Sequence, residues 1–283
     1  MNPKDTFPAK GSDKTYTYHR HPAWSPTALK AAATGTMAAW WHKFQPGAPV
    51  FDPSPDMIKG DLVDALLLPP RSLSGRFAVY DTIARSKADG KRNVQEAQEA
   101  GVIPVTTEMF DHANRICDVL RADPIIGEIL AAIDDAHSQQ PHFWDDVAGR
   151  PCRCLPDIVT RDGRLFDLKK TRSAVPRRFY WQAKDLAYDL QMAHLAIGHQ
   201  SRHGAPPALV GIIAFEWDEP FDRSVLLLDE QDLSKGLERR EEAFRRIAEC
   251  QAAGEWPSHG LQPFRPPASA ATRPAEVEEV ELF

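Results

Sequence analysis

The stretch PCRCLPDIVTRDGRLFDLKKT, residues 151–171, places two largely apolar runs on either side of an Arg-Asp-Gly sequence. A three-residue loop with glycine in the left-handed position is a common hairpin turn. The stretch therefore predicts a β-hairpin in which Thr160 pairs with Arg164. In that register Asp157 lies directly opposite Asp167, with the two Cβ atoms about 4.5–5.5 Å apart.

Lys169 follows Asp167 by two residues, so both side chains are expected on the same face of the strand. One interpretation is a solvated hairpin whose charges form cross-strand ion pairs. The other is a metal site, because two opposed carboxylates repel each other unless a cation such as Mg²⁺ or Mn²⁺ lies between them. A neighbouring lysine could then stabilise negative charge in a phosphoryl transition state. A two-residue loop would shift the pairing by one and weaken this geometry.

The bulk composition is that of a globular protein. The chain has 283 residues, of which 42% are hydrophobic and 26% charged, enough for one large domain or two small ones. No apolar run approaches the length that crosses a bilayer, and the N-terminus lacks the apolar segment of a secretory signal. We therefore expect a cytoplasmic protein without a membrane partner.

The four cysteines are too few and too scattered for a disulfide framework. Cys152 and Cys154 alternate along a predicted strand, so both are expected to point to one face and pack in the core. Their spacing is not that of iron–sulfur ligands, and no iron–sulfur cluster is expected.

Charge is unevenly distributed. The net charge is −6, yet residues 161–184 hold eight Lys or Arg and two Asp, a local charge of +6. Because phosphate attraction is local and screened over about 8 Å, this segment is a candidate surface for nucleic acid.

Helix and strand signals predict an α/β (α+β layered) fold with a central mixed β-sheet flanked by helices. The N-terminal segment 25–44 is predicted as one helix, with Ser25 as N-cap and Pro26 at the first helical position. A three-strand meander is expected over 141–171 and a long amphipathic helix over 177–203. Residues 1–22 are predicted to be flexible, 23–261 to form one domain, and 262–283 to form a disordered acidic tail.

Pro156-Asp157, nine intervening residues and Asp167-Leu168-Lys169 resemble the PD-(D/E)XK nuclease pattern, whose core is a helix, a three-strand meander, a helix and a strand. The chain further resembles the RecE-type (exonuclease VIII-like) exonucleases of phages and prophages, over about residues 25–257. The similar segments are WSPTALKAAATG, IKGDLVDALLLPP, FWDDVAGRPCRCLPDIV, FDLKKT, YDLQMAHLAIG and GEWP.

This resemblance implies Asp157 and Asp167 as metal ligands, Lys169 as the catalytic lysine, and Gln191 as a residue that orders the DNA end or the active site. Asp64 stands where the family usually has a metal-binding histidine, and a carboxylate can still bind Mg²⁺, with Mn²⁺ as an alternative. Two further departures are Gln139, at a position that is usually acidic, and Leu195, which replaces a tyrosine.

The resemblance implies a Mg²⁺-dependent exodeoxyribonuclease that degrades linear double-stranded DNA 5′→3′ and leaves 3′ single strands for a single-strand annealing protein. It also implies a homo-oligomeric ring. The basic residues expected to contact backbone phosphates, rather than to form a solvated loop, are Lys170, Arg172, Arg177 and Arg178. The alternatives are a catalytically impaired protein that binds DNA ends, and a structure-specific endonuclease on the same core.

Overall fold

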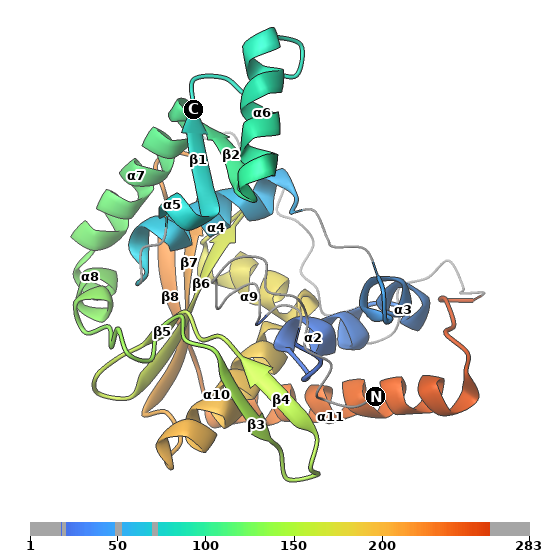
Figure 1. Cartoon of the computed structure of the whole chain (residues 1–283). Coiled ribbons are helices and arrows are strands. Elements are labelled where there is room, and N and C mark those ends of the chain that lie inside the picture. Colours follow the sequence, from blue (N-terminus) through green and yellow to red (C-terminus); the bar gives the residue numbers. More distant parts are fainter. Residues whose placement is uncertain (1–17, 19–20, 49–52, 70–72, 261–283) are drawn as a thin grey trace, which may run out of the picture.

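A four-stranded mixed sheet lies at the centre of the molecule (Figure 1). The structure is a computed structural model that describes residues 18, 21–48, 53–69 and 73–260. In spatial order the strands are β5 (Ile158–Val159), β6 (Arg164–Thr171), β7 (Leu209–Glu216) and β8 (Arg223–Leu228). The pair β6–β7 is parallel and the two outer pairs are antiparallel, which confirms the predicted mixed sheet. The predicted acidic tail, and most of the predicted flexible segment 1–22, lie outside the described residues.

The hairpin between β5 and β6 has the predicted register. Ile158 pairs with Phe166 and Val159 with Leu165. The N–H of Thr160 donates to the carbonyl of Arg164 at 2.9 Å, which closes a three-residue loop. Gly163 has a φ of +82°, the left-handed conformation that this turn requires and that favours glycine.

Side chains of β6 alternate between two core layers. Phe166 and Leu168 pack in the cluster covered by α4 (Pro55–Leu67), α7 (Thr107–Ala122) and α8 (Pro124–Ala131). Leu165 packs on the opposite face, in the cluster that contains apolar residues of α10 (Tyr188–His203). With a side-chain period of two, Asp167 and Lys169 belong to the same face as Leu165. The sheet thereby points both functional candidates toward α10.

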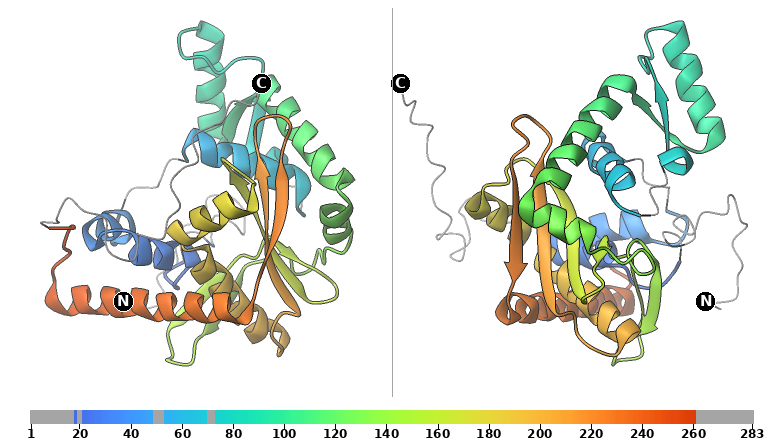
Figure 2. Two further views of the ribbon diagram at one scale, coloured as in Figure 1. Left: turned by 180° about the vertical axis from the view of Figure 1, so that it is seen from behind. Right: turned by 90° about the vertical axis from the view of Figure 1, so that its left-hand side faces the viewer.

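The N-terminal segment forms two helices where the sequence predicted one. Ser25 caps α2 (Pro26–Thr34) as predicted, since its Oγ accepts a hydrogen bond from the N–H of Ala28. Gly35 ends this helix, and the Oγ of Thr36 accepts from the N–H of Ala39 to cap α3 (Met37–Phe44). Thr36 thus supplies an acceptor at the new helix N-terminus, which makes the break favourable. Both helices pack against α11 (Glu230–Ala253), which runs beneath the sheet in Figure 2.

The predicted helix 177–203 is also divided, into α9 (Pro176–Asp185) and α10. Ala187, at the junction, is buried and has a φ of +52°, an uncommon conformation for a residue with a Cβ. The break changes the chain direction immediately before Tyr188. No glycine or proline lies at the junction, so the local sequence did not indicate the break.

Two small sheets complete the fold. The parallel pair β1 (Phe77–Tyr80) and β2 (Ile103–Thr106) stands above the central sheet in Figure 1 with α5 (Leu73–Arg76) and α6 (Ala88–Ala100). The antiparallel pair β3 (His142–Asp145) and β4 (Pro151–Cys154) forms a separate sheet. The predicted three-strand meander is therefore wrong in detail, because β4 pairs with β3 and the chain enters the central sheet only at β5.

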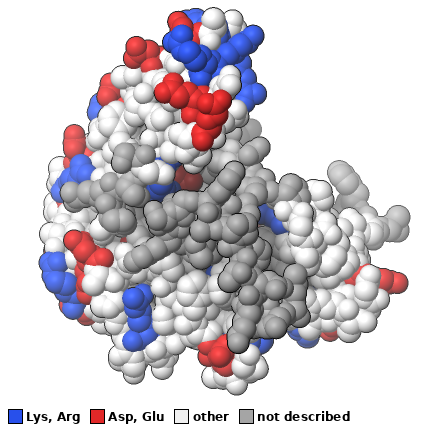
Figure 3. All heavy atoms as spheres, viewed as in Figure 1, with Lys and Arg blue, Asp and Glu red and all other residues white. Residues whose placement is uncertain are grey.

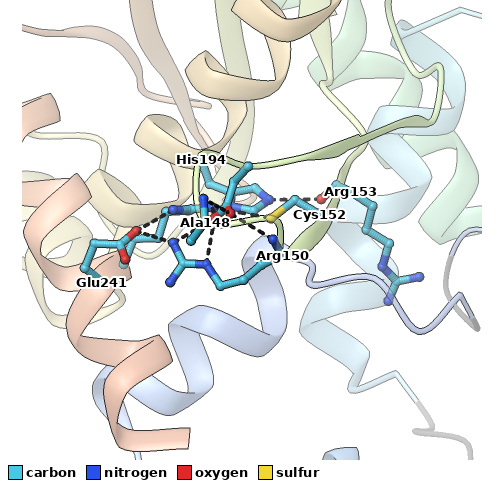
Figure 4. Close-up of polar contacts among 8 residues, drawn as sticks. Ala148, Arg150, Cys152, Arg153, His194 and Glu241 are labelled. Atoms are coloured by element: carbon cyan, nitrogen blue, oxygen red, sulfur yellow. Dashed lines mark hydrogen bonds and ion pairs between the residues drawn. The ribbon is translucent and has the colours of Figure 1, made fainter. Parts of the chain in front are cut away.

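A buried polar network ties α11 to α10 and to the β3–β4 hairpin (Figure 4). The guanidinium of Arg240 donates to Asp146 Oδ2 at 2.8 Å and to His194 Nδ1 at 3.2 Å. Since Nδ1 accepts, Nε2 of His194 carries the proton and donates to the carbonyl of Arg153 at 3.1 Å. Cys152 lies against Arg240, and both it and Cys154 are buried as predicted. None of the helices in the described part of the chain has the length and apolarity needed to span a membrane.

Candidate active site

The β5–β6 hairpin brings Asp157, Asp167 and Lys169 together. Asp167 is 2% exposed, and its Oδ2 forms an ion pair with the ammonium of Lys169. Asp157 immediately precedes β5, and its Oδ2 accepts a hydrogen bond from the N–H of Leu168 at 3.0 Å. The carboxylate of Asp157 is therefore tied to the backbone between the other two residues.

Gln191 approaches the same carboxylate from α10. Its Nε2 donates to Asp167 Oδ1 at 2.8 Å, and its Oε1 accepts from the ammonium of Lys30 on α2. Gln191 is 9% exposed, so little water reaches its amide, and both the amide N–H₂ and the amide oxygen require hydrogen-bond partners within the protein. The structure thus places the predicted glutamine in direct contact with one of the predicted metal ligands.

Gln139 approaches the other carboxylate. Its Nε2 donates to Asp157 Oδ1 at 2.8 Å, and its backbone N–H donates to the carbonyl of Pro156 at 2.8 Å. The residue has a φ of +53°, a conformation that costs about 1–3 kcal/mol and persists where the surroundings enforce it. Gln139, which the resemblance marked as a departure at a usually acidic position, is therefore a residue of this site.

The acidic groups affect one another electrostatically. Burial, and then the neighbouring Asp61, raise the pKa of Asp64 to about 7. Burial raises the pKa of Asp157 well above its usual value, and the charges of Asp167 and Asp64 raise it further. Burial lowers the pKa of Lys169, but Asp167 and Asp157 outweigh it, and the net pKa is raised. The ionised forms of Asp64 and Asp157 are thus disfavoured by burial and by neighbouring carboxylates, although Lys169 partly opposes both shifts.

In the described part of the chain, no three His, Cys, Asp or Glu side chains are arranged as a metal-binding group. Lys169 occupies Asp167 Oδ2, and both oxygens of Asp157 accept hydrogen bonds. The donor chemistry nevertheless fits a hard divalent cation, because buried carboxylates that raise one another's pKa are stabilised by positive charge. Asp64, Asp157 and Asp167 are the residues that would hold it.

Comparison with protein families now gives a match over residues 27–262, to the PDDEXK-like domain of unknown function (DUF3799). The chain belongs to this family. Its fold is similar to that of a crystal structure from Eubacterium rectale, provisionally described as an exonuclease, with a TM-score of 0.62 and 14% sequence identity. That similarity covers 95% of this chain and 100% of the other. No curated protein matches the sequence.

The predicted DNA-contacting residues differ in their surroundings. Lys170 is on the face of β6 opposite Lys169, and its ammonium pairs with Asp56 Oδ1 at 2.9 Å. Arg172, Arg177 and Arg178 are exposed, and the latter two lie in the first turn of α9. On the described surface in Figure 3, acidic and basic side chains intermingle over α6. Exposure thus leaves three of the four predicted residues accessible to a phosphate backbone, while Lys170 is engaged.

Leu195, which replaces the tyrosine of the glutamine motif, is 2% exposed and packs in the apolar cluster beneath β6. It contributes to the core and not to the polar contacts around Asp167.

The sequence analysis assigned no role to Lys30, or to Tyr188, the first residue of the segment YDLQMAHLAIG. The ammonium of Lys30 lies 4.9 Å from the centroid of the Tyr188 ring, and that of Lys169 lies 5.5 Å from the same centroid. One signal was present in the sequence: Lys30 interrupts the Ala-rich run of α2 directly after the buried residues Ala28 and Leu29. A lysine inside an apolar helix face indicates a buried charge with a partner.

Proposed function

We propose that this PDDEXK-like protein is a Mg²⁺-dependent exodeoxyribonuclease that degrades linear double-stranded DNA. The observation that carries the proposal is the convergence of Asp157, Asp167 and Lys169, with Gln191 donating to Asp167. Two carboxylates and one ammonium at this spacing are suited to phosphodiester hydrolysis. The proposal assigns the activity to a single domain, residues 23–261.

The residues of the chain have distinct roles in this proposal. Asp64, Asp157 and Asp167 would hold the divalent cation, which when bound would activate water and polarise the scissile phosphate. Lys169 donates hydrogen bonds to the phosphate oxygens as negative charge develops on them. Gln191 and the N–H of Leu168 orient the carboxylates of Asp167 and Asp157, respectively.

The exposed arginines supply binding without sequence selectivity. Arg172, Arg177 and Arg178 are proposed to contact backbone phosphates, which positions the duplex and makes binding sensitive to salt. For Lys170, a phosphate would have to displace Asp56 from its ammonium. We expect the arginines to contribute more than Lys170.

Three finer features follow from the resemblance to RecE-type exonucleases. They are 5′→3′ polarity, release of 3′ single strands to a single-strand annealing protein, and a homo-oligomeric ring that keeps the enzyme on its substrate. They belong to the proposal as expectations for experiment. Duplex labelled separately at its 5′ and 3′ ends distinguishes the two polarities, and light scattering of the purified chain gives its oligomeric state.

The test compares linear and closed circular duplex DNA, in Mg²⁺ or in EDTA. The wild-type protein should degrade linear DNA only with Mg²⁺ and leave the circle intact, and Asp167→Asn should abolish this loss. Asp111→Asn, at an exposed position of α7, is the matched control and should retain full activity. Nicking of the circle would instead identify an endonuclease.

A second candidate, a DNA-end-binding protein without cleavage, is favoured by one observation. Gln139 offers an amide N–H₂ to Asp157, at a place where a further carboxylate would add a metal ligand. This candidate predicts tight binding to DNA ends with no loss of linear DNA at any Mg²⁺ concentration. The same assay, read alongside fluorescence anisotropy of a labelled duplex, separates the two functions.

A further inference from the structure

Lys30 is the second lysine beside the predicted catalytic carboxylates, and it comes from an element distant in the sequence. It lies on α2, whose neighbouring residues Leu29 and Ala32 are fully buried in the core. Lys30 itself is half-buried, and its ammonium reaches Gln191 Oε1 on α10. The contact joins two helices whose sequence positions are 161 residues apart.

The chemistry of this contact fixes the orientation of the Gln191 amide. A lysine ammonium can only donate, and an ionised carboxylate can only accept. Gln191 lies between the two, with Oε1 toward Lys30 and Nε2 toward Asp167. Rotation of the amide by 180° would place Nε2 against the Lys30 ammonium, donor against donor, and Oε1 against Asp167 Oδ1, acceptor against acceptor. Only one orientation therefore satisfies both partners.

That orientation determines which oxygen of Asp167 faces Gln191 and which faces Lys169. The Gln191 amide donates to Oδ1, whereas Oδ2 is buried and faces the ammonium of Lys169. The hydrogen bond from Gln191 to Oδ1 therefore sets the rotation of the carboxylate, and with it the position of Oδ2 beside Lys169. Lys30 influences the site through this relay of Gln191 and Asp167.

Keeping a charged group at this place is costly. Burial, and then the nearby ammonium of Lys169, lower the pKa of Lys30 to about 7, although Asp167 and Asp157 partly oppose the shift. An apolar side chain of the same length would avoid this desolvation cost. Lys30 lowers the stability of the fold through this desolvation cost, and it contacts Gln191 in the candidate site. Its presence is therefore more readily explained by function than by stability.

We infer that Lys30 is a positioning residue of the candidate active site, acting through the amide of Gln191 on Asp167. The inference rests on the proposed nuclease function and extends it to a residue on α2. Lys30→Met keeps the length of the side chain and its packing but removes the donor. Lys30→Arg keeps a donor and is the conservative rescue variant.

The experiment is a double-mutant cycle of Lys30→Met and Gln191→Ala, measured as single-turnover cleavage of end-labelled linear duplex in Mg²⁺. Each single variant should lower the cleavage rate constant by about 10-fold, while the half-saturating protein concentration changes less than about 2-fold. The double variant should be no slower than the slower single variant, because both changes break one relay. Lys30→Arg should recover most of the lost rate.

Lys235→Met, at an exposed position of α11, is the matched control and should cleave at the wild-type rate. Two results would overturn the inference while the proposed function stands: wild-type cleavage by Lys30→Met, or losses that multiply in the double variant. A wild-type protein that shows no Mg²⁺-dependent cleavage overturns the proposed function itself, and the inference falls with it. Circular dichroism of each variant excludes unfolding as the cause of a lost rate.

Discussion

The carboxylate of Asp157 accepts a hydrogen bond from the backbone N–H of Leu168, at 3.0 Å, across the open end of the hairpin. Leu168 lies between Asp167 and Lys169, so a single hydrogen bond sets the position of Asp157 relative to both. Asp157 also accepts from Gln139, which leaves its carboxylate with a donor on each oxygen. Its position is thus determined by backbone and side chain together.

Asp157→Asn tests this arrangement. An amide has one acceptor oxygen, so it keeps the hydrogen bond from Leu168 only if its N–H₂ group faces Gln139, whose own amide must then rotate to accept. We expect the cleavage rate to fall at least about 100-fold. The free energy of unfolding should change by less than about 2 kcal/mol, because the weaker hydrogen bonds of a neutral amide and the removal of a buried charge act in opposite directions. Cleavage assays and urea denaturation measure the two quantities, and near-wild-type cleavage would contradict the assigned role.

Gln139→Glu tests the electrostatic state of the site. The new carboxylate faces Asp157, whose pKa is already raised by burial and by Asp167 and Asp64. In EDTA at pH 8 the variant should unfold about 2–4 °C below wild type, which corresponds to roughly 1 kcal/mol of like-charge repulsion. Added Mg²⁺ should close this gap, because the cation binds the added carboxylate. Gln140→Glu, the adjacent position, is the control, and an equal Mg²⁺ response in both variants would contradict the prediction.

The exposed arginines and Lys170 should differ in DNA binding. Arg177→Ala and Arg178→Ala each remove an exposed cation at the start of α9, and each should lower the slope of log affinity against log salt by about one. Lys170→Ala should have a smaller effect, since its ammonium already pairs with Asp56. Anisotropy titrations of a labelled duplex at several salt concentrations, in EDTA, provide the slopes. Equal slopes for wild type and both arginine variants would place the DNA elsewhere.

Part of this site could be derived from local sequence. The Arg-Asp-Gly turn fixed the hairpin register, because a three-residue loop with Gly163 in the left-handed position permits one pairing, and the positions of Asp157 and Asp167 followed. The face shared by Asp167 and Lys169 followed from the period of a strand. These relationships depend on backbone geometry within a few residues, which sequence patterns encode directly.

Other parts depend on contacts between distant segments. The pairing of Lys30 with Gln191 arises only when α2 packs beside α10, and no local periodicity indicates that packing. The breaks at Gly35 and Ala187 were also missed. At the first, a good N-cap, Thr36, makes a second helix favourable; at the second, the surrounding core holds Ala187 in an uncommon conformation. The Lys30–Gln191 contact and the two helix breaks therefore depend on tertiary packing more than on helical propensity.

Asp64→Asn should stabilise the metal-free protein in a pH-dependent manner. The folded-state pKa of Asp64 is about 7, above the ordinary aspartate value, so the folded state retains a proton that the unfolded state has lost. The resulting destabilisation of wild type is absent below about pH 4, grows as pH rises, and is complete above about pH 7. Asp64→Asn should therefore unfold about 5 °C above wild type at pH 8 in EDTA, and with little difference at pH 4. Thermal unfolding in EDTA at the two pH values provides the comparison.

The same variant should lose Mg²⁺-dependent stabilisation if Asp64 holds the cation. Wild type should gain thermal stability on addition of Mg²⁺ at pH 8, whereas Asp64→Asn should gain less than half as much. Asp118→Asn, at an exposed position of α7, is the control and should respond as wild type. A full Mg²⁺ response by Asp64→Asn would remove Asp64 from the metal ligands.

His194 should make the stability of the whole fold sensitive to acid. Burial, and then the charge of Arg240, lower the pKa of His194 to about 3, so the folded state excludes a proton that the unfolded histidine binds near pH 6.5. Stability from this residue is therefore complete above about pH 6.5 and is lost as pH falls toward 3, with a slope of up to about 1.4 kcal/mol per pH unit. His194→Gln cannot titrate, and it should flatten the pH dependence of unfolding between pH 6.5 and pH 4. Urea denaturation across that range tests this, with His42→Gln, an exposed histidine of α3, as the control. Parallel pH profiles for wild type and His194→Gln would show that His194 takes up its proton without opening the network around Arg240.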